Sequence, residues 1–238
     1  MISNWWGRSF LKHCRRELRS HVSDPAAVVT RIRDHAERVY QKSAENEPNK
    51  KTRAVYAYCS LVLAAFREIR SETGDEPQAF HVARTAFHKT CAPAWRVIMK
   101  LFVWFVPDPV AYFQRNSPAK SGQKQLGPTM EFDEEYAEGN VDLVVRRCGF
   151  NQFFVDHGEP SLTPVLCVFD HYWMKALDRS RRPVRTERPS TISLGGDCCR
   201  FRLIRDADKQ DSQPSDIVLV ALENPPYTHS SSSPGNAK

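Results

Sequence analysis

The chain has 238 residues with a formal net charge of +6, and 41% of its residues are hydrophobic. This length and composition are typical of a folded protein with a substantial core, and they exclude a disordered chain. The longest apolar run, residues 92–106, is shorter than the ~20 residues that span a bilayer and is broken by Arg96 and Lys100. We therefore expect one compact domain overall, without a membrane span.

The basic residues are scattered, and no nucleic-acid-binding motif accompanies them. We interpret the positive charge as a solvated surface excess and expect no nucleic-acid partner. The N-terminus has no apolar stretch followed by a small-residue cleavage site, which argues against a secretory signal. Its arginines leave a mitochondrial transit peptide as the less favoured alternative. We expect a cytoplasmic protein whose seven cysteines are reduced thiols.

The first half of the chain is predicted to be helical, over residues 1–115. Asp24 is a helix N-cap and Pro25 takes the first helical position of an amphipathic helix that runs to about Ala44. A second helix is expected at about 52–72 and a third from about Asp75, while Pro93 opens a fourth that ends at residues 107–109. Residues 116–140 are polar and rich in Pro and Gly, so we predict a linker or mobile loop there.

The second half changes pattern, and an α+β region is predicted over residues 141–223. The expected elements are a strand at 141–147, a short helix at 150–157 ended by Gly158, and a longer helix from Pro160 to about Leu177. A β-hairpin follows over Val184–Arg205, turning at Gly195-Gly196-Asp197, then a buried strand at 217–222. Residues 224–238 are expected to be a disordered tail. The fold class is α+β: an N-terminal helical half followed by an antiparallel sheet with two inserted helices.

Two groups of residues in this second half occur in a characteristic order. The first group is Cys148-Gly-Phe150 followed by Phe154, Gly158, Pro160, Leu162, Cys167 and Asp170. The second is Arg188 with Thr191, Gly195, Gly196, Asp197, Cys199 and Phe201. Together they resemble the L-2-amino-thiazoline-4-carboxylic acid hydrolase family over residues 141–205. That family is similar in fold to 4-vinyl-reductase-type small-molecule-binding domains.

The resemblance implies an enzyme that opens a small heterocycle of sulfur and nitrogen by hydrolysis. The thiols that match the family pattern are Cys148, Cys167 and Cys199, and the matching acids are Asp170 and Asp197. A thiol becomes a nucleophile near neutral pH when a positive neighbour lowers its pKa. We therefore expect Cys199 or Cys148 to be the nucleophile, with Asp170 or Asp197 as the orienting or proton-handling group.

His157 is the preferred base in a Cys-His arrangement. His171 directly follows Asp170 on a predicted helix, so these two side chains point about 100° apart and cannot both face one site. The residues expected to bind substrate are Thr191, Arg188, Phe154 and Trp104.

Other interpretations of the thiols remain open. Three thiols and a carboxylate could ligate zinc, but Cys148 and Cys167 stand 19 positions apart, and the adjacent Cys198 and Cys199 on a strand point to opposite faces. We expect no metal and no cofactor. The cysteines could also simply fill the core.

Two further functions compete with hydrolysis of a small-molecule substrate. One is a non-hydrolytic cyclase of natural-product biosynthesis that promotes ring closure, such as an intramolecular Diels–Alder reaction, by positioning and one oriented hydrogen bond. The other is a non-catalytic small-molecule-binding module. A hydrolase needs one reactive cysteine, whereas a cyclase or a binding module does not.

Overall fold

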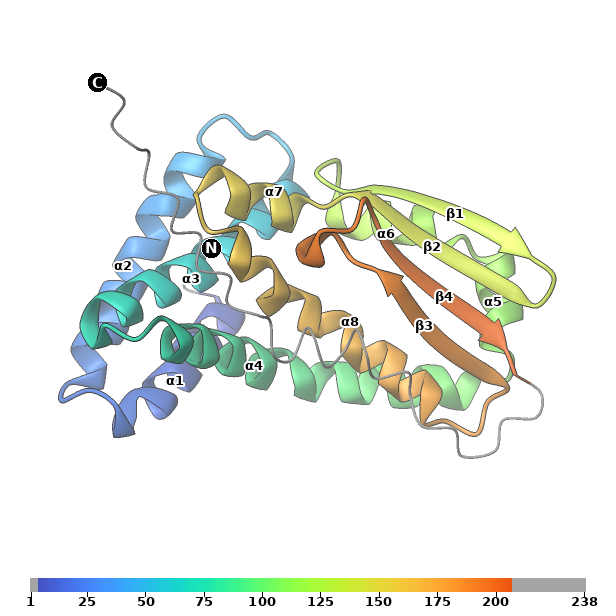
Figure 1. Ribbon diagram of the computed structural model, residues 1–238, viewed down its shortest axis with the longest axis horizontal. Helices are drawn as coiled ribbons and strands as arrows, with labels where there is room; N and C mark the ends of the chain where they lie inside the picture. Colours follow the sequence, from blue (N-terminus) through green and yellow to red (C-terminus); the bar gives the residue numbers. More distant parts are fainter. Residues whose placement is uncertain (1–3, 207–238) are drawn as a thin grey trace, which may run out of the picture.

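The structure, a computed structural model, describes residues 4–206. Figure 1 shows the helices of residues 5–73 packed together at one end and a sheet at the other, with α4 and α8 running between them and α5 and α6 beside the sheet. The first half contains α1 (Trp5–Glu17), α2 (Pro25–Ala44), α3 (Lys50–Thr73), α4 (Glu76–Phe105), α5 (Pro109–Arg115) and α6 (Pro118–Leu126). The second contains β1 (Glu131–Ala137), β2 (Asn140–Arg147), α7 (Gly149–Asp156), α8 (Thr163–Asp178), β3 (Val184–Ser190) and β4 (Cys199–Arg205). Three short 3₁₀ turns are η1 (Leu18–Ser20), η2 (Pro160–Leu162) and η3 (Ile192–Leu194). The predicted α+β class is confirmed, with α7 and α8 inserted between two strands.

Capping residues explain where the early helices begin. Asp24, Asn49 and Asp75 each accept hydrogen bonds from backbone N–H groups in the first turn of the helix that follows. These bonds satisfy donors that have no carbonyl partner inside the helix. α3 ends where Gly74 adopts a φ of 68°, a left-handed conformation that glycine reaches without steric cost. The start and end of α2 and α3 therefore agree closely with the sequence signals.

α3 forms the centre of the helical part. Its residues 61–66 are fully buried, and α1, α2 and α4 pack around it. Each large apolar side chain buried there contributes about 2 kcal/mol. The same apolar cluster continues into α7 and α8 through Phe154 and Leu166. The helical half and the two inserted helices thus share one core, which fixes the position of α8 beside the sheet.

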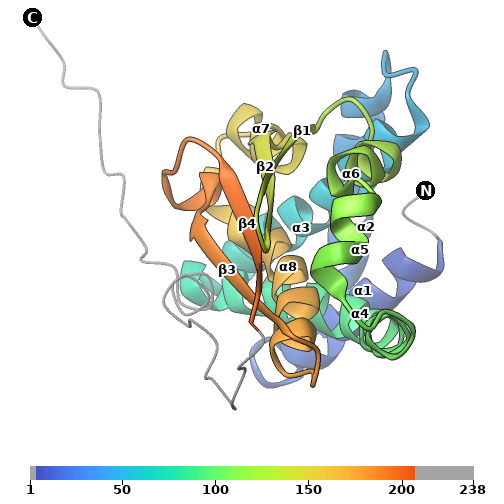
Figure 2. The same cartoon turned by 90° about the vertical axis from the view of Figure 1, so that its right-hand side faces the viewer.

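Among the described residues, four strands form one antiparallel sheet in the order β1-β2-β4-β3. Val145 lies opposite Cys199, and Leu143 lies opposite Phe201. Directly opposed residues share a face of the sheet, so these side chains point the same way. This inner face packs against α8, α4 and α5, where Leu177, Met99 and Val110 contact the strands; Figure 2 shows α8 and α5 on one side of the sheet.

The outer face of the sheet carries a network of ion pairs. The Asp142 carboxylate accepts hydrogen bonds from Arg200 at 2.8 Å and from Arg202 at 2.9 Å, and Arg200 also donates to Glu135. Burial opposes ionisation of Asp142, but the bonds from Arg202 and Arg200 hold its pKa below the ordinary value. The outer arginines therefore have carboxylate partners on the protein itself.

One expected helix boundary is wrong. We predicted that Pro93 opens a new helix, but α4 is continuous from Glu76 to Phe105 with Pro93 inside it. An internal proline removes one backbone hydrogen bond and costs about 3 kcal/mol. The helix continues because its two parts are held on both sides of the proline, by α1 and α3 along one stretch and by α8 along the other.

The segment 116–140 is another correction, since it is not a loop. It contains α6 and the edge strand β1, which pairs with β2 along its whole length. We predicted a loop from the composition of this segment, which does not reveal two local signals. Ser117 caps α6, with Pro118 at its first position, and the charged strand has its acidic side chains neutralised by arginines such as Arg146 across the sheet.

The hairpin over Val184–Arg205 is confirmed, because β3 pairs antiparallel with β4. Its first strand is shorter than expected: β3 ends at Ser190, and Ile192 and Leu194 lie in the 3₁₀ turn η3 instead of a strand. The predicted strand at 217–222 and the predicted tail at 224–238 lie outside the described residues. No helix within residues 4–206 is long and apolar enough to cross a membrane.

Candidate active site

The candidate site lies where α8 meets the end of the hairpin. On α8, Cys167 and Asp170 are three residues apart, which places them on one face of the helix. On β3 and β4, alternation places Arg188 and Cys199 on the inner face of the sheet, and both are buried. The structure therefore brings together four of the residues that the sequence predicted.

Arg188 is the centre of this group. Its side chain is only 2% exposed, and its Nη1 lies 3.4 Å from Asp170 Oδ2. Its Nη2 donates to Cys199 Sγ at 3.8 Å, and the guanidinium lies 4.6 Å from the centre of the Phe201 ring. A guanidinium stays protonated at every physiological pH. A fixed positive charge thus contacts both the thiol and the carboxylate.

Three buried polar atoms of this group have no hydrogen-bond partner among the described residues. They are Nε and Nη1 of Arg188 and Oγ1 of Thr191. Leaving buried donors unpaired is costly, and most buried polar atoms in proteins are paired. Nη1 faces Asp170 Oδ2 at 3.4 Å, so it has the ion-pair contact, whereas Nε has neither a hydrogen bond nor an ion pair among the described residues.

The loop between β3 and β4 holds the Cys199 sulfur in place. The backbone N–H of Ile192 donates to Cys199 Sγ at 3.3 Å. Gly195 has a φ of 88°, and Gly196 packs so tightly that an added Cβ would lie 3.0 Å from the Thr191 carbonyl oxygen. These glycines let the loop fold back onto Thr191, so that the neighbouring Ile192 amide reaches the Cys199 thiol. The Arg188 guanidinium and the Ile192 amide thus both donate to this sulfur.

The other two matching thiols lie near Cys199 in less favourable surroundings. Cys148 packs against the cluster that contains Cys199, at the start of α7. Burial raises the pKa of Cys148 to about 12. Burial also raises the pKa of Cys167, although Arg188 opposes the shift, and its sulfur lies 3.5 Å from Ser193 Oγ. Both thiols stay protonated at neutral pH.

Asp170 lies on α8 beside Arg188 and is the carboxyl group of the candidate site. Burial raises its pKa above the ordinary value, and the Arg188 charge opposes that shift. Its side chain remains 27% exposed, so the carboxyl group is accessible from solvent. Trp173 Nε1 donates to Asp170 Oδ1 at 3.4 Å and fixes its orientation.

Four predicted site residues are not brought to the thiols. His157 Nδ1 bonds to the Phe153 carbonyl, and it lies at the opposite end of α7 from Cys148, about 13 Å along the helix axis. Phe154 is buried in the helical core. Asp197 is exposed at the tip of the loop, and Trp104 is 76% exposed near the end of α4.

His171 faces away from this site, as its adjacency to Asp170 implied. Its Nε2 lies 3.3 Å from Lys175 Nζ on the other side of α8. Among the described residues, Cys167 and Cys199 bond to Ser193, Arg188 and the Ile192 amide, and none of these partners of the site's thiols is a histidine.

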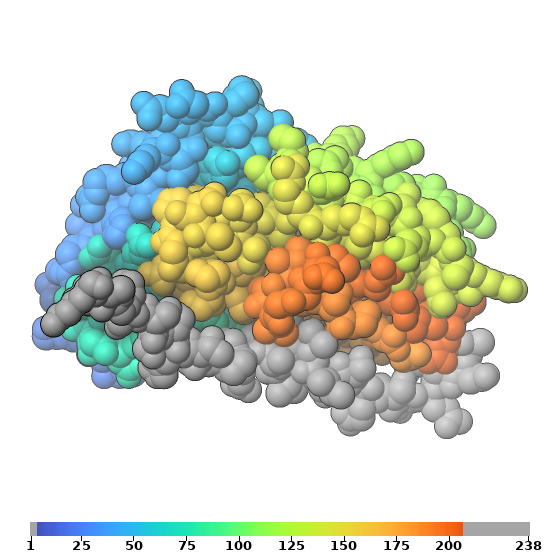
Figure 3. Space-filling model, turned by 45° about the horizontal axis from the view of Figure 1, so that its top comes forward, coloured from blue at the N-terminus to red at the C-terminus, as the bar shows by residue number. Residues whose placement is uncertain are grey.

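Sequence analysis did not identify three groups that contact the site residues. Trp173 follows Asp170 by three residues, so helical periodicity places it on the same face and would have found it. Ser193 and the Ile192 amide carry no such signal, because their position depends on the 3₁₀ turn within the loop. Figure 3, like Figure 1, shows this loop beside α7 at the surface, next to the end of the helix where Cys148 lies.

Within residues 4–206, no group of three or more His, Cys, Asp or Glu side chains is placed to hold a metal ion. The arrangement that the fold does provide is a buried thiol, a fixed guanidinium and a partly exposed carboxyl group. This combination makes the junction of α8 and the hairpin the candidate active site.

Comparison with protein families gives the class of the protein. Residues 52–203 match the L-2-amino-thiazoline-4-carboxylic acid hydrolase family, and the chain belongs to this family. The match begins in α3 and ends in β4, so it includes α8, the hairpin and every residue of the candidate site. Comparisons with curated proteins and with solved structures found no match.

Proposed function

We propose that this protein is a cysteine-dependent hydrolase that opens a small heterocycle of nitrogen and sulfur bearing a carboxylate. The observation that carries the proposal is the buried Arg188, which contacts both Cys199 and Asp170 while its Nε lacks a partner among the described residues. The family name supplies the substrate class, a 2-amino-thiazoline-4-carboxylate. In this proposal the unpaired Nε–H of Arg188 donates to the substrate carboxylate.

The proposed reaction has two halves. In the first, the Cys199 thiolate adds to the ring carbon that lies between nitrogen and sulfur. The ring C–S bond then breaks, and the departing sulfur takes the proton of Asp170. In the second, water attacks the carbon bound to Cys199 and gives its proton back to Asp170. The bond to Cys199 breaks and restores the thiolate, so the cycle consumes one water and releases an open-chain thiol.

The raised pKa of Asp170 supports its role in this scheme. A general acid works best when its pKa lies near the operating pH, and an ordinary aspartate would be fully ionised there. Burial moves Asp170 in the required direction. The proposed roles are thus nucleophile for Cys199, substrate and charge binding for Arg188, and proton transfer for Asp170.

The decisive experiment compares two neighbouring cysteines. Cys199 lies on the inner face, whereas Cys198 points the other way, toward Ser190. With 2-amino-thiazoline-4-carboxylate as substrate, each turnover releases a thiol that a colorimetric thiol reagent detects. Cys199→Ala is expected to abolish thiol release, and Cys198→Ala is expected to retain it. Equal activity in both variants would rule out Cys199 as the nucleophile.

Iodoacetamide labelling gives an independent test of the same residue. In the native protein, Cys199 is expected to react faster than Cys148 and Cys167, because burial keeps those two protonated. Peptide mass spectrometry identifies the labelled site. We further propose a cytoplasmic location, because free thiols are typical of proteins in a reducing compartment.

A second candidate function is a cyclase of natural-product biosynthesis. It is favoured by one observation: within the described residues, the thiols of the site have no histidine base. Here the unpaired Nε–H of Arg188 would polarise a carbonyl group of the substrate during ring closure. The same pair of cysteine variants separates the two proposals, because a cyclase keeps its activity in Cys199→Ala. If the protein binds a small molecule but catalyses neither hydrolysis nor ring closure, it is a binding module.

A further inference from the structure

The second half of α4 exposes an unusual amount of apolar surface. The exposed fractions are 58% for Val97, 49% for Ile98, 54% for Leu101, 76% for Trp104 and 74% for Phe105. Their spacing places them along one side of the helix over about two turns. We call these five residues the α4 stripe. Single exposed apolar residues are common, but a contiguous set of this kind marks an interaction surface.

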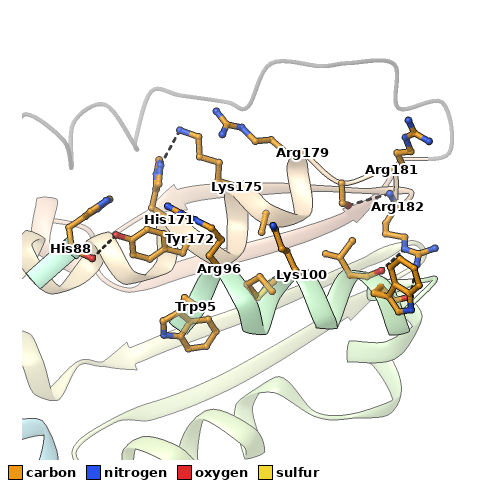
Figure 4. A pocket seen from close by; sticks show the side chains of 15 residues that line it. His88, Trp95, Arg96, Lys100, His171, Tyr172, Lys175, Arg179, Arg181 and Arg182 are labelled. Atoms are coloured by element: carbon orange, nitrogen blue, oxygen red, sulfur yellow. Dashed lines mark hydrogen bonds between the residues drawn. The ribbon is translucent and has the colours of Figure 1, made fainter. Parts of the chain in front are cut away.

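A groove of about 910 Å³ between α4 and α8 borders the stripe. Arg96 and Lys100 line it from α4, and Lys175, Arg179, Arg181 and Arg182 line it from α8 and the turn that follows. Figure 4 shows Arg96 and Lys100 on the side of α4 that faces α8. Its floor is apolar and includes Met99, Val103 and Ala176.

The charge of this groove is not neutralised by its own lining. Among the described residues that line it, none is an aspartate or a glutamate. The outer arginines of the sheet differ, because Asp142 and Glu135 neutralise them. A cluster of cations without such carboxylates attracts a negatively charged partner.

The end of the groove is held rigidly. Arg182 Nε donates to the Val103 carbonyl at 2.7 Å, and its Nη2 donates to the Trp104 carbonyl at 2.8 Å. These carbonyls belong to the last turn of α4, where a positive charge also complements the helix dipole. The bonds tie the stripe to the turn after α8, so stripe and cations keep a fixed relation.

We propose that the α4 stripe and the cationic groove form a docking surface for an anionic phospholipid bilayer. The stripe enters the boundary between headgroups and acyl chains, where tryptophan and phenylalanine are favoured, and the groove cations contact lipid phosphates. Charge favours this occupant over a second copy of the chain, which would bring the same cations to the contact. The surface is separate from the Arg188 site and independent of the proposed reaction.

Vesicle co-sedimentation of the full chain tests the proposal. Binding is expected to vesicles that contain phosphatidylserine and to be much weaker with phosphatidylcholine only, and added salt is expected to reduce it. Equal binding to both vesicle types, or binding to neither, overturns the proposal.

Matched variants test each half of the surface. Leu101→Ser with Phe105→Ser is expected to weaken vesicle binding by at least about tenfold, while Trp5→Ser with Val155→Ser, two exposed residues on other helices, is not. Lys100→Glu with Arg179→Glu is expected to weaken it by a similar factor, while Arg38→Glu with Lys42→Glu on α2 is not. Equal losses in a variant and its control would overturn the proposal. So would a lipid-free dimer that the stripe variant converts to a monomer in sedimentation velocity.

Discussion

The two faces of the sheet use arginine in opposite ways. On the outer face, Arg200 and Arg202 share Asp142, and each of their bonds ends on a carboxylate of the protein. On the inner face, Arg188 is more deeply buried, yet its Nε and Nη1 have no hydrogen-bond partner among the described residues. A structural arginine is satisfied by its own chain, whereas an arginine kept partly unsatisfied is available to a ligand. The following changes test that difference.

The largest expected effect is on catalysis, from Arg188→Met. The variant keeps the volume of the side chain but loses its charge and donors, so kcat/KM for thiol release should fall by at least about a hundredfold. The unfolding free energy should change little, because the lost ion pair with Asp170 is offset by removal of a buried charge with an unpaired donor, and Asp170, whose pKa burial raises, can become protonated. Activity assays and urea unfolding of the same preparations measure the two effects. A large loss of stability with retained activity would show that Arg188 is structural.

Asp142→Ala is expected to show the opposite pattern. It leaves Arg200 and Arg202 without their shared partner, so the free energy of unfolding should fall by about 2 kcal/mol. This loss is smaller than for a fully buried ion pair, because both arginines reach solvent. Activity should be retained, since the outer face is remote from Cys199. A hundredfold loss of activity in a folded variant would contradict the separation of the two faces.

The pH dependence of stability should differ in sign between Asp142 and Asp170. The lowered pKa of Asp142 gives stability that is present above the unfolded pKa of ~3.9 and is lost as the pH falls through the folded pKa. The raised pKa of Asp170 means that its ionisation destabilises the folded state as the pH rises above the unfolded value. Asp142→Asn should therefore lower the free energy of unfolding more at neutral than at acidic pH. Asp170→Asn should raise the free energy of unfolding, and by more at neutral than at acidic pH. Urea unfolding at both pH values measures this, and equal signs would contradict it.

The smallest expected effect compares two adjacent glycines. A Cβ at Gly196 meets the Thr191 backbone at 3.0 Å, whereas one at Gly195 has open space but a φ of 88°. Both alanine variants should lose about 1 kcal/mol of stability. Only Gly196→Ala should also reduce activity, because Thr191 must shift and the neighbouring Ile192 amide then leaves Cys199. Equal activity in the two variants would show that the amide is unimportant.

Much of the fold could be predicted from local signals. Caps and periodicity placed α2 and α3, and alternation placed the hairpin, since both depend on nearby residues. The continuous α4 could not be predicted, because tertiary packing on both sides of Pro93 outweighs the local cost of the proline. β1 was missed for a related reason: its charged residues become a strand only when Arg146 and Arg200 neutralise them.

The candidate site was predicted in part. The resemblance to the family supplied Cys199, Arg188, Cys167 and Asp170, and helix and strand periodicities place each of them on a definite face. His157 was expected as a base because His171, directly after Asp170 on a helix, could not face the same site. The structure instead turns it away at the far end of α7, an outcome that depends on where that helix begins and ends. Sequence patterns thus located the charged groups, but not the contact between Arg188 and the sulfur.

The strand order also has a consequence for how the chain folds. The pairs β1–β2 and β3–β4 are close in sequence, but the central pair β2–β4 joins strands separated by α7, α8 and β3. Closing such a long loop is slow, so the two outer pairs are expected to form early and the central pair to join them late. Cys199 lies opposite Val145 in that late pair. The sulfur that we propose as the nucleophile would then reach its final surroundings only in the last stage of folding.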